Sequence, residues 1–338
     1  MFFFVYLPYN FIQSFIFDPN KMHYFKNKKK YMNFRNIPVL ISILLLVGCQ
    51  SAFSIPEVIS FPIPSKVDFA GQTIALERYD MRERYDREQI IIAYNHSVSL
   101  LHIKRANRFF PVIEPILKRN GIPDDFKYLA VIESNLDQRA MSGAQAAGIW
   151  QFMPKTAQQF GLEVNEEVDE RYHVEKATAA ACIYFKSAYN KYKNWITVAA
   201  SYNAGMGKIS EERTKQQVDE AFDLLLTSES SRYIFRLMAM KSFLENPKAF
   251  GYSLQKEHFY PTIRTLEIEV KDSVNDWTSW ASKYGITYSQ LKDFNIWLRD
   301  RKLTNPTKKI YKVLLPEKAD LLFNSTKILI HNQMWLDF

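Results

Sequence analysis

Residues 123–136 read Pro-Asp-Asp-Phe-Lys-Tyr-Leu-Ala-Val-Ile-Glu-Ser-Asn-Leu, and this pattern is the starting point for predicting the fold. An acidic pair directly after Pro123 is typical of a helix start, so an Asp is expected as the N-cap. Apolar residues follow at helical spacing and place Glu133 on the same face, close to the end of the helix. The stretch therefore predicts a helix that carries one acidic side chain toward the core.

The surroundings of Glu133 predict an unusual carboxyl group. The negative end of the helix dipole lies close to it, and Leu129, Val131 and Ile132 would withdraw it from water. Both effects disfavour ionisation and raise the pKa. A carboxylic acid that stays protonated near neutral pH can donate a proton to a glycosidic oxygen. A Glu at the solvated edge of an amphipathic helix would give the same pattern, so this helix alone does not decide the function.

Three further segments narrow the interpretation. Residues 146–157 contain Gly-Ile-Trp-Gln-Phe-Met-Pro, residues 200–207 read Ala-Ser-Tyr-Asn-Ala-Gly-Met-Gly, and residues 231–234 read Ser-Arg-Tyr-Ile. With Glu-Ser at 133–134, these segments resemble, in order and spacing, the motifs of the lytic transglycosylase family, over roughly residues 90–250. The similarity is to the membrane-bound lytic murein transglycosylase D type, in which Trp precedes the Gln. The resemblance implies a mainly α, goose-lysozyme-like catalytic domain.

The family resemblance also implies roles for individual residues. Glu133 would be the general acid and then the base, and Met153 and Trp150 would supply apolar wall. The residues implied in substrate binding are Ser134, Gln151, Met153, Tyr202, Asn203 and Tyr233. Amide and phenol groups suit sugar hydroxyls and N-acetyl groups, and aromatic faces suit sugar rings. Ordinary core packing is the alternative for Trp150, Tyr202 and Tyr233.

The implied reaction is cleavage of the MurNAc-β-1,4-GlcNAc bond of peptidoglycan glycan strands, leaving 1,6-anhydro-MurNAc ends. A hydrolytic muramidase and a non-catalytic peptidoglycan-binding lipoprotein that kept the fold remain alternatives. No cofactor is implied, and no metal site is expected because the chain has neither His-Glu-x-x-His nor Cys-x-x-Cys.

Three positions depart from the family pattern. Ser201 stands where Ala is usual, Gln145 where Gly is common, and His173 where an acidic residue is more usual. None of these changes removes the acid, so they affect the details of the cleft and not the reaction class.

The N-terminus has the pattern of a lipoprotein signal. A basic stretch at 26–35 precedes an apolar run at 37–47, and Leu-Val-Gly leads to Cys49. The run is too short to span a bilayer as a helix. We expect residues 1–48 to be a signal peptide, with 1–31 a possible upstream extension before Met32, and Cys49 to carry the lipid anchor. An uncleaved anchor or a free thiol is the alternative; the expected location is the periplasmic face of the outer membrane.

The charge distribution argues against a nucleic-acid partner. The chain of 338 residues carries a formal net charge of +8, but six basic residues and one acidic residue precede Cys49. The expected mature chain is therefore only weakly basic, and no basic stripe with interleaved aromatics is present. A monomer is expected.

Composition along the chain divides it into segments. We expect a lipidated N-terminus and tether at 49–85, the catalytic domain at 86–255, a small module at 262–318 and a tail at 319–338. In the catalytic domain, a helical stripe from Ala177 to Tyr192 predicts core, with Cys182 beside it as a small buried residue.

The small module is expected to have β-α-α-β order. Strand-like runs at 266–270 and 309–314 flank helical stretches at 275–284 and 288–295. The unit resembles a degenerate LysM domain, with Lys-Asp-Ser at 271–273 where Gly-Asp-Thr is usual. Binding of N-acetylglucosamine and a purely structural role both remain open for it.

Overall fold

The computed structural model describes residues 59–337 of the chain. The predicted signal peptide, Cys49 and residues 50–58 of the predicted tether lie outside the described residues. No helix within 59–337 is both long enough and apolar enough to cross a membrane.

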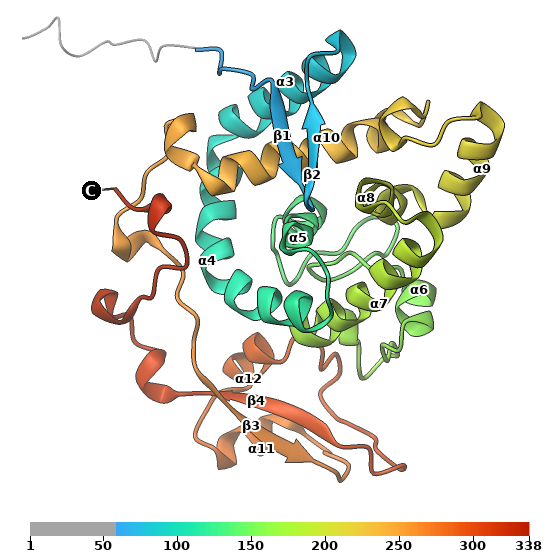
Figure 1. Ribbon diagram of the computed structural model, residues 1–338. Coiled ribbons are helices and arrows are strands. Elements are labelled where there is room, and N and C mark those ends of the chain that lie inside the picture. Colours follow the sequence, from blue (N-terminus) through green and yellow to red (C-terminus); the bar gives the residue numbers. More distant parts are fainter. Residues whose placement is uncertain (1–58, 338) are drawn as a thin grey trace, which may run out of the picture. The chain divides into compact units, whose positions relative to one another are not determined.

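Helices dominate the described chain up to residue 250, as predicted (Figure 1). Their bounds are α3 Tyr79–Tyr94, α4 His96–Arg119, α5 Lys127–Ser134, α6 Pro154–Gln159, α7 Val174–Tyr192, α8 Trp195–Ala204, α9 Met206–Gln216 and α10 Ser228–Glu245. Short 3₁₀ turns connect several of them, among which η3 spans Asp124–Phe126 and η4 spans Glu170–Tyr172.

The start of α5, the helix that carries Glu133, differs from the expectation. The acidic pair forms η3 and makes no N-cap hydrogen bond, and α5 begins only at Lys127. Asp125 instead accepts hydrogen bonds from the Ala70 amide at 2.7 Å and from Lys241 Nζ at 2.8 Å. Asp125 thus joins the start of α5 to two distant segments, which a local pattern does not reveal.

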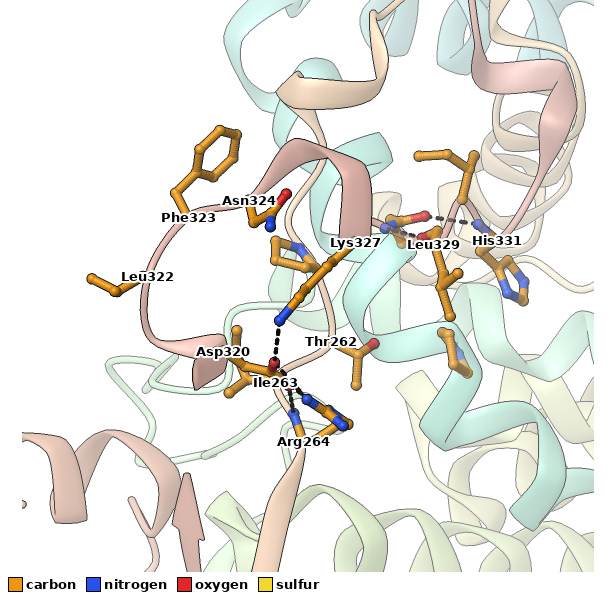
Figure 2. Close-up of a pocket in the computed structure, with 14 residues that line it drawn as sticks. Thr262, Ile263, Arg264, Asp320, Leu322, Phe323, Asn324, Lys327, Leu329 and His331 are labelled. Carbon is orange, nitrogen blue, oxygen red and sulfur yellow. Dashed lines mark hydrogen bonds and ion pairs between the residues drawn. The ribbon is translucent and has the colours of Figure 1, made fainter. Parts of the chain in front are cut away.

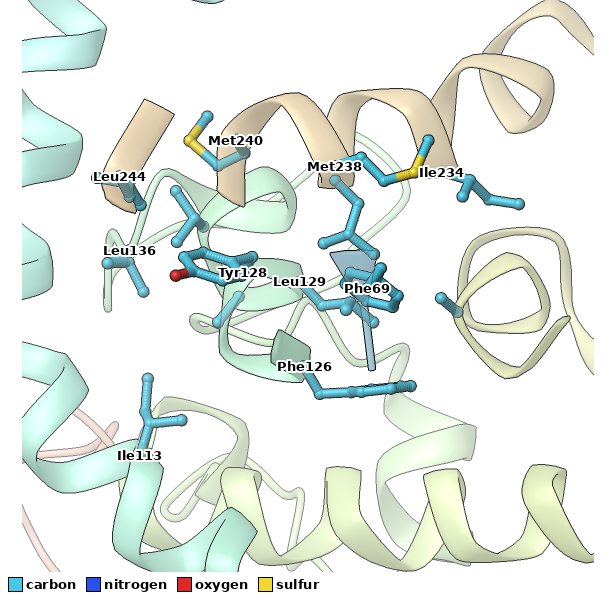
Figure 3. Close-up of a cluster of buried hydrophobic side chains, with 14 of the residues drawn as sticks. Phe69, Ile113, Phe126, Tyr128, Leu129, Leu136, Ile234, Met238, Met240 and Leu244 are labelled. Atoms are coloured by element: carbon cyan, nitrogen blue, oxygen red, sulfur yellow. The ribbon is translucent and has the colours of Figure 1, made fainter. Parts of the chain in front are cut away.

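Helix α5 lies inside the helical core. In Figure 1 it stands at the centre, with α4, α7, α8 and α10 around it. Five of its eight side chains are apolar or aromatic, and Leu129, Ala130 and Val131 are fully buried. Figure 3 shows Leu129 beside Phe69 and below Met238 of α10. A core this close-packed fixes the position of a polar side chain at the end of α5.

A β-hairpin occupies part of the predicted tether. Strands β1 (Lys66–Phe69) and β2 (Gln72–Ala75) pair antiparallel, and the turn between them uses Ala70 and Gly71 at φ 51° and 78°. Phe69 is fully buried, and its ring lies 5.8 Å from that of Phe126. The expectation of a tether therefore does not hold for residues 61–85, because buried aromatic side chains attach them to the core.

The long helix α7 confirms the predicted core stripe. Its buried residues include the alanines and tyrosines expected between Ala177 and Tyr192. Cys182 is buried without a disulfide, and burial raises the pKa of its thiol to about 11. A thiol that resists ionisation is a packing residue and not a nucleophile.

The second unit has the predicted β-α-α-β order. Strands β3 (Thr265–Val270) and β4 (Tyr311–Pro316) pair antiparallel, with Thr265 opposite Pro316 and Val270 opposite Tyr311. Helices α11 (Trp277–Lys283) and α12 (Tyr288–Phe294) lie between them in sequence. The fully buried Asn295 completes the unit, since its side chain bonds the backbone of Leu291 and Leu314.

The predicted tail, which the structure describes from 319 to 337, packs on the helical core. Trp335 is buried, its indole N–H donates to the Leu244 carbonyl at 2.6 Å, and its ring stacks on Phe259. Asn107 of α4 donates to the Leu329 carbonyl and accepts from the His331 amide. The chain therefore returns to the helical core after completing the small unit.

Candidate active site

Glu133 and Tyr233 meet at the centre of the predicted site. Glu133 is the penultimate residue of α5, and Tyr233 lies in the second turn of α10, one hundred residues further along the chain. The tyrosine hydroxyl donates a hydrogen bond of 2.6 Å to Oε1 of Glu133. The packing of α10 on α5 therefore supplies the carboxyl group with a fixed partner.

The electrostatics of Glu133 agree with the expectation from its sequence. Burial raises its pKa to about 7 and outweighs the Tyr233 hydrogen bond and the Arg236 charge, both of which lower it. The negative charge of Glu229 raises the pKa further. A carboxyl group with this pKa holds its proton over part of the near-neutral range and can also release it.

Tyr202 forms a second phenol beside the acid. It belongs to α8, its hydroxyl donates to the Trp150 carbonyl at 2.7 Å, and its ring packs against Tyr184 and Phe185. Burial and the neighbouring Glu133 charge raise the pKa of Tyr202 well above its usual value. Tyr202 is therefore a neutral phenol that also fixes the loop before α6.

Trp150 does not line a cleft. Its side chain is fully buried, and its indole N–H donates to Thr178 Oγ1 of α7 at 2.8 Å. The interpretation of Trp150 as apolar wall is wrong, because its ring is part of the packed core. Met153, by contrast, is 43% exposed at the start of α6.

The loop that carries Gln151 is held by close backbone contacts. Gln151 has φ 49°, and its side-chain amide donates to the carbonyls of Gly148 and Ala140. Gly148 has φ 75°, and a Cβ there would lie 1.9 Å from the Arg171 carbonyl oxygen. Only glycine allows the two chain segments to approach this closely.

A buried ion pair supports the same loop. Arg171 of η4 pairs with Asp169 at 2.7 Å, and both side chains are less than 10% exposed. The same guanidinium donates to the carbonyls of Gln145 and Phe152, at the two sides of the loop. Arg171 is a structural residue that the sequence motifs did not single out.

The remaining predicted residues lie near the acid but have protein partners. The Ser134 hydroxyl is buried and donates to the backbone of Ala130 and Ile149, so it joins α5 to the loop. The side-chain Oδ1 of Asn203 accepts a hydrogen bond from the Ser230 hydroxyl of α10 at 2.7 Å. Cys49, the predicted lipidation site, lies outside the described residues.

The three departures from the family pattern have local explanations. Gln145 has φ 68°, which accounts for the glycine that is common at this position. Ser201 is fully buried, and its hydroxyl donates to the Val198 carbonyl within α8. His173 pairs with Glu175 at 3.0 Å and stacks on Trp297 of the second unit.

Sequence reasoning missed the charged residues of α10 and α3. The charge of Glu229 raises the pKa of Glu133, and the charge of Arg236 lowers it. Arg236 also pairs with the fully buried Glu88 of α3. Glu88 is a buried acidic residue inside a helix with a charged pattern, and only its partners on α10 distinguish it from a solvated residue.

A separate cavity of about 690 Å³ lies between α4 and the tail. Figure 2 shows Arg264 and Lys327 pointing at Asp320 on one side of it and Phe323 turned away. None of the predicted catalytic or substrate-binding residues lines this cavity. Within 59–337, no three His, Cys, Asp or Glu side chains gather as a possible metal site.

The second unit is attached to the segment that precedes α7. The Asp169 amide donates to the Trp297 carbonyl, and the Arg299 amide donates to the Glu167 carbonyl, both at 2.8 Å. Arg299 also lies over the Tyr172 ring, 4.4 Å from its centroid. Beside these contacts, Val168 and Tyr172 form one apolar cluster with buried residues of the second unit.

Comparison with known protein families assigns both units. Residues 110–224 match the Transglycosylase SLT domain, and residues 266–319 match the Soluble lytic transglycosylase C-terminal LysM-like domain. The chain therefore contains a lytic transglycosylase-type domain of mainly α structure, followed by a LysM-like domain with a two-stranded sheet, as predicted.

The chain is also similar to individual proteins. The chain is 27% identical over 221 residues to membrane-bound lytic murein transglycosylase D of Escherichia coli (strain K12), covering 64% of this chain and 47% of the relative. It is thus homologous to that protein but spans about half its length. It is also 21% identical to a putative tributyltin chloride resistance protein of Alteromonas sp. (strain M-1), covering 55% of this chain and 91% of that protein.

Among solved structures, the chain is similar to the 70 kDa soluble lytic transglycosylase of Escherichia coli. The identity is 20%, the TM-score is 0.35, and the match covers 40% of this chain and 24% of the other.

Proposed function

We propose that the protein is a peptidoglycan lytic transglycosylase. It would cleave the MurNAc-β-1,4-GlcNAc bond and leave 1,6-anhydro-MurNAc ends. The observation that carries the proposal is the buried carboxyl of Glu133, whose pKa is raised to about 7 inside a transglycosylase SLT domain. The name of the homologous E. coli protein supports the same reaction class.

Glu133 would act twice in this reaction. Its protonated form donates to the glycosidic oxygen, and the bond to the muramyl C1 breaks as positive charge develops on that carbon. The carboxylate then removes the proton from the muramyl 6-hydroxyl, whose oxygen bonds to C1 and closes the anhydro ring. One carboxyl group therefore both supplies and recovers the proton, and no water is consumed.

The neighbouring side chains suit the assigned roles. Tyr233 would orient the acid through its 2.6 Å hydrogen bond, and Gln151, Asn203 and Tyr202 would meet sugar hydroxyls and acetamido groups. Met153 is exposed and would offer apolar surface to a sugar face. Ser134 would act indirectly, by holding the loop that carries Gln151 against α5.

The test is digestion of purified peptidoglycan by the full-length chain, beside Glu133→Gln. Mass spectrometry would separate anhydro-muropeptides from hydrated products. Anhydro products from the wild type that are absent from the variant are the expected result. Hydrated reducing ends would instead identify a muramidase, and release by neither protein with retained wall binding would identify a non-catalytic binding protein.

We further propose that Cys49 carries a lipid anchor after removal of residues 1–48, on the periplasmic face of the outer membrane. The basic and apolar stretches before Cys49 and the membrane-bound relative support this proposal. Cys49→Ser should move the protein from the membrane fraction to the soluble fraction. Retention of the variant in the membrane fraction would contradict lipidation at this site.

The LysM-like domain would bind N-acetylglucosamine units of the same strand. Tyr284 is 39% exposed at the end of α11, and its ring lies 4.5 Å from that of Trp280. Such an aromatic pair suits a sugar face. Tyr284→Ala should weaken pull-down of the Glu133→Gln protein on peptidoglycan, whereas unchanged pull-down would leave the domain with a structural role alone.

A further inference from the structure

Glu88 is a carboxylate with no exposure to solvent, surrounded by guanidinium groups. It lies on α3, and its oxygens accept from Arg232 Nε at 2.7 Å and Arg236 Nε at 3.4 Å. The Nε of Arg87 lies 3.2 Å away on the same helix. A buried charge is stable only when it is paired, so this cluster fixes α3 against α10.

The two arginines of α10 flank the tyrosine that contacts the acid. Arg232 precedes Tyr233 directly, and Arg236 follows it by three residues, which places Arg236 on the neighbouring part of the same helical face. The charge of Arg236 acts on Glu133, yet no ion pair within 4.0 Å joins the two among the described residues. Arg236 thus forms an ion pair with Glu88, and its charge acts on Glu133 from a longer distance.

The space around Arg236 would allow its side chain to move. A cavity of about 140 Å³ is lined by Glu88, Arg236 and His102, and by Ile132 and Asn135, which flank residues 133–134. The Arg236 side chain thus borders this cavity while its guanidinium pairs with Glu88.

We propose that Glu88 is a positioning residue for the reaction: its buried carboxylate holds Arg236 away from Glu133 and fixes the turn of α10 that presents Tyr233 to the acid. The inference rests on the proposed function. Without Glu88, the positive charge of Arg236 would be uncompensated and free to approach Glu133. The ionised form of Glu133 would gain stability, and the proton needed by the leaving oxygen would be lost at lower pH.

The charged and titratable groups around Glu133 come from α10, α8 and α4. From α10 these are Tyr233, Glu229 and Arg236, and from α8 it is Tyr202. His102 of α4 lies near the end of α5 and bonds Asn135, and burial lowers its pKa to about 4, so it is neutral where Glu133 titrates. Glu88 also pairs with Arg232, but of these two α10 arginines it is Arg236 whose charge lowers the pKa of Glu133.

The test compares pH profiles of full-length variants. In the wild type, release of anhydro-muropeptides should fall as the pH rises through about 7. Glu88→Gln should move this alkaline midpoint down by about one pH unit. The double variant Glu88→Gln/Arg236→Gln should return the midpoint at least to the wild-type value, because it removes the cation that lowers the pKa of Glu133. Arg87→Gln is the matched control, since it removes the exposed third guanidinium and should leave the midpoint in place.

Two results would overturn the proposal. One is an unchanged midpoint in a folded Glu88→Gln protein, and the other is a double variant that stays as shifted as Glu88→Gln. If Glu88→Gln does not fold, the alkaline midpoint of the single variant Arg236→Gln tests the proposal. Removing this cation should raise the midpoint, and an unchanged midpoint would reject the role of Arg236.

A readout without turnover separates this inference from the proposed function. Infrared difference spectroscopy can follow the carboxyl band of Glu133 during a pH titration, with Glu133→Gln to assign the band. A band midpoint that falls in Glu88→Gln and returns in the double variant supports the positioning role even if no peptidoglycan is cleaved. A band midpoint that does not respond rejects it even if the wild type is active.

Discussion

The hydroxyl of Tyr233 lies 2.6 Å from Oε1 of Glu133 and joins α10 to the end of α5. A phenol that donates to a carboxylate stabilises its ionised form, so this hydrogen bond limits how far burial can raise the pKa of Glu133. The pair combines two needs of a group that must first give and then take a proton: fixed orientation and a pKa near neutrality.

Replacing Tyr233 by Phe should raise the pKa of Glu133. The lost charge-assisted hydrogen bond corresponds to about one pH unit, so the alkaline limb of the pH–activity profile should move up by that amount. The pH dependence of anhydro-muropeptide release measures the shift. Tyr184→Phe is the control, because the Tyr184 hydroxyl is also buried but donates to the Ser201 carbonyl. A Tyr233→Phe limb that moves to lower pH would contradict the assigned hydrogen bond.

Glu133→Gln should stabilise the protein at high pH. The pKa of Glu133 is raised from 4.5 to about 7 in the folded state, so the folded chain holds a proton that the unfolded chain releases between these values. The free energy of unfolding therefore falls as the pH rises through this window, by about 3 kcal/mol in order of magnitude. Above pH 8 the variant should have the higher Tm, and near pH 4 the two should agree.

Thermal unfolding across pH 4–9 checks this prediction. Glu257→Gln provides the comparison, since it makes the same substitution at an exposed site. Equal Tm values for Glu133→Gln and the wild type above pH 8 would mean that the carboxyl group is ionised without cost in the folded protein.

Gly148→Ala should disrupt the loop that carries Gln151. The new Cβ would clash with the Arg171 carbonyl oxygen at 1.9 Å, and the backbone has φ 75°. A loss of about 3 kcal/mol in the free energy of unfolding is expected, measured by chemical denaturation. Gly143→Ala is the matched control in the same loop, because a Cβ at that position would have no atom within 4 Å. Similar losses for both variants would show that the loop has no close contact at 148.

Trp335→Ala should destabilise the helical core although the residue lies near the end of the chain. The buried indole packs on Phe259 and donates to the Leu244 carbonyl, so its removal should cost about 3–5 kcal/mol. Met334→Ala, at a position 49% exposed, should change stability by less than about 0.5 kcal/mol. Chemical denaturation gives both values; a neutral Trp335→Ala would mean that the tail is only loosely attached.

The sequence could predict the helical domain, the β-α-α-β unit and the raised pKa of Glu133, because each depends on local periodicity and nearby apolar residues. The hairpin at 66–75 could not be predicted, since its strands have four residues each and its stability comes from Phe69 in a distant core. The packing of the tail on the helical core was not predicted for the same reason, because one tryptophan and short 3₁₀ turns give no periodic signal.

Within the site, the resemblance to family motifs identified Glu133 and Tyr233 but did not show which side chains contact them. Trp150 and Tyr202 are both aromatic and both motif residues, yet one is core and the other lies beside the acid. The contacts between Glu88 and α10 span 144 and 148 residues, so no spacing in the chain indicates them.

The backbone bonds between Asp169 and Trp297 and between Glu167 and Arg299 have a mechanical consequence. Asp169 also pairs with Arg171, which holds both sides of the loop carrying Gln151. The LysM-like domain is thereby connected to the loop by hydrogen bonds and an ion pair, and not by a flexible linker alone. If the helical domain and the LysM-like domain bind one glycan strand, their two binding surfaces meet it at a constant separation and angle. Strand curvature would then decide where along the wall the protein can settle.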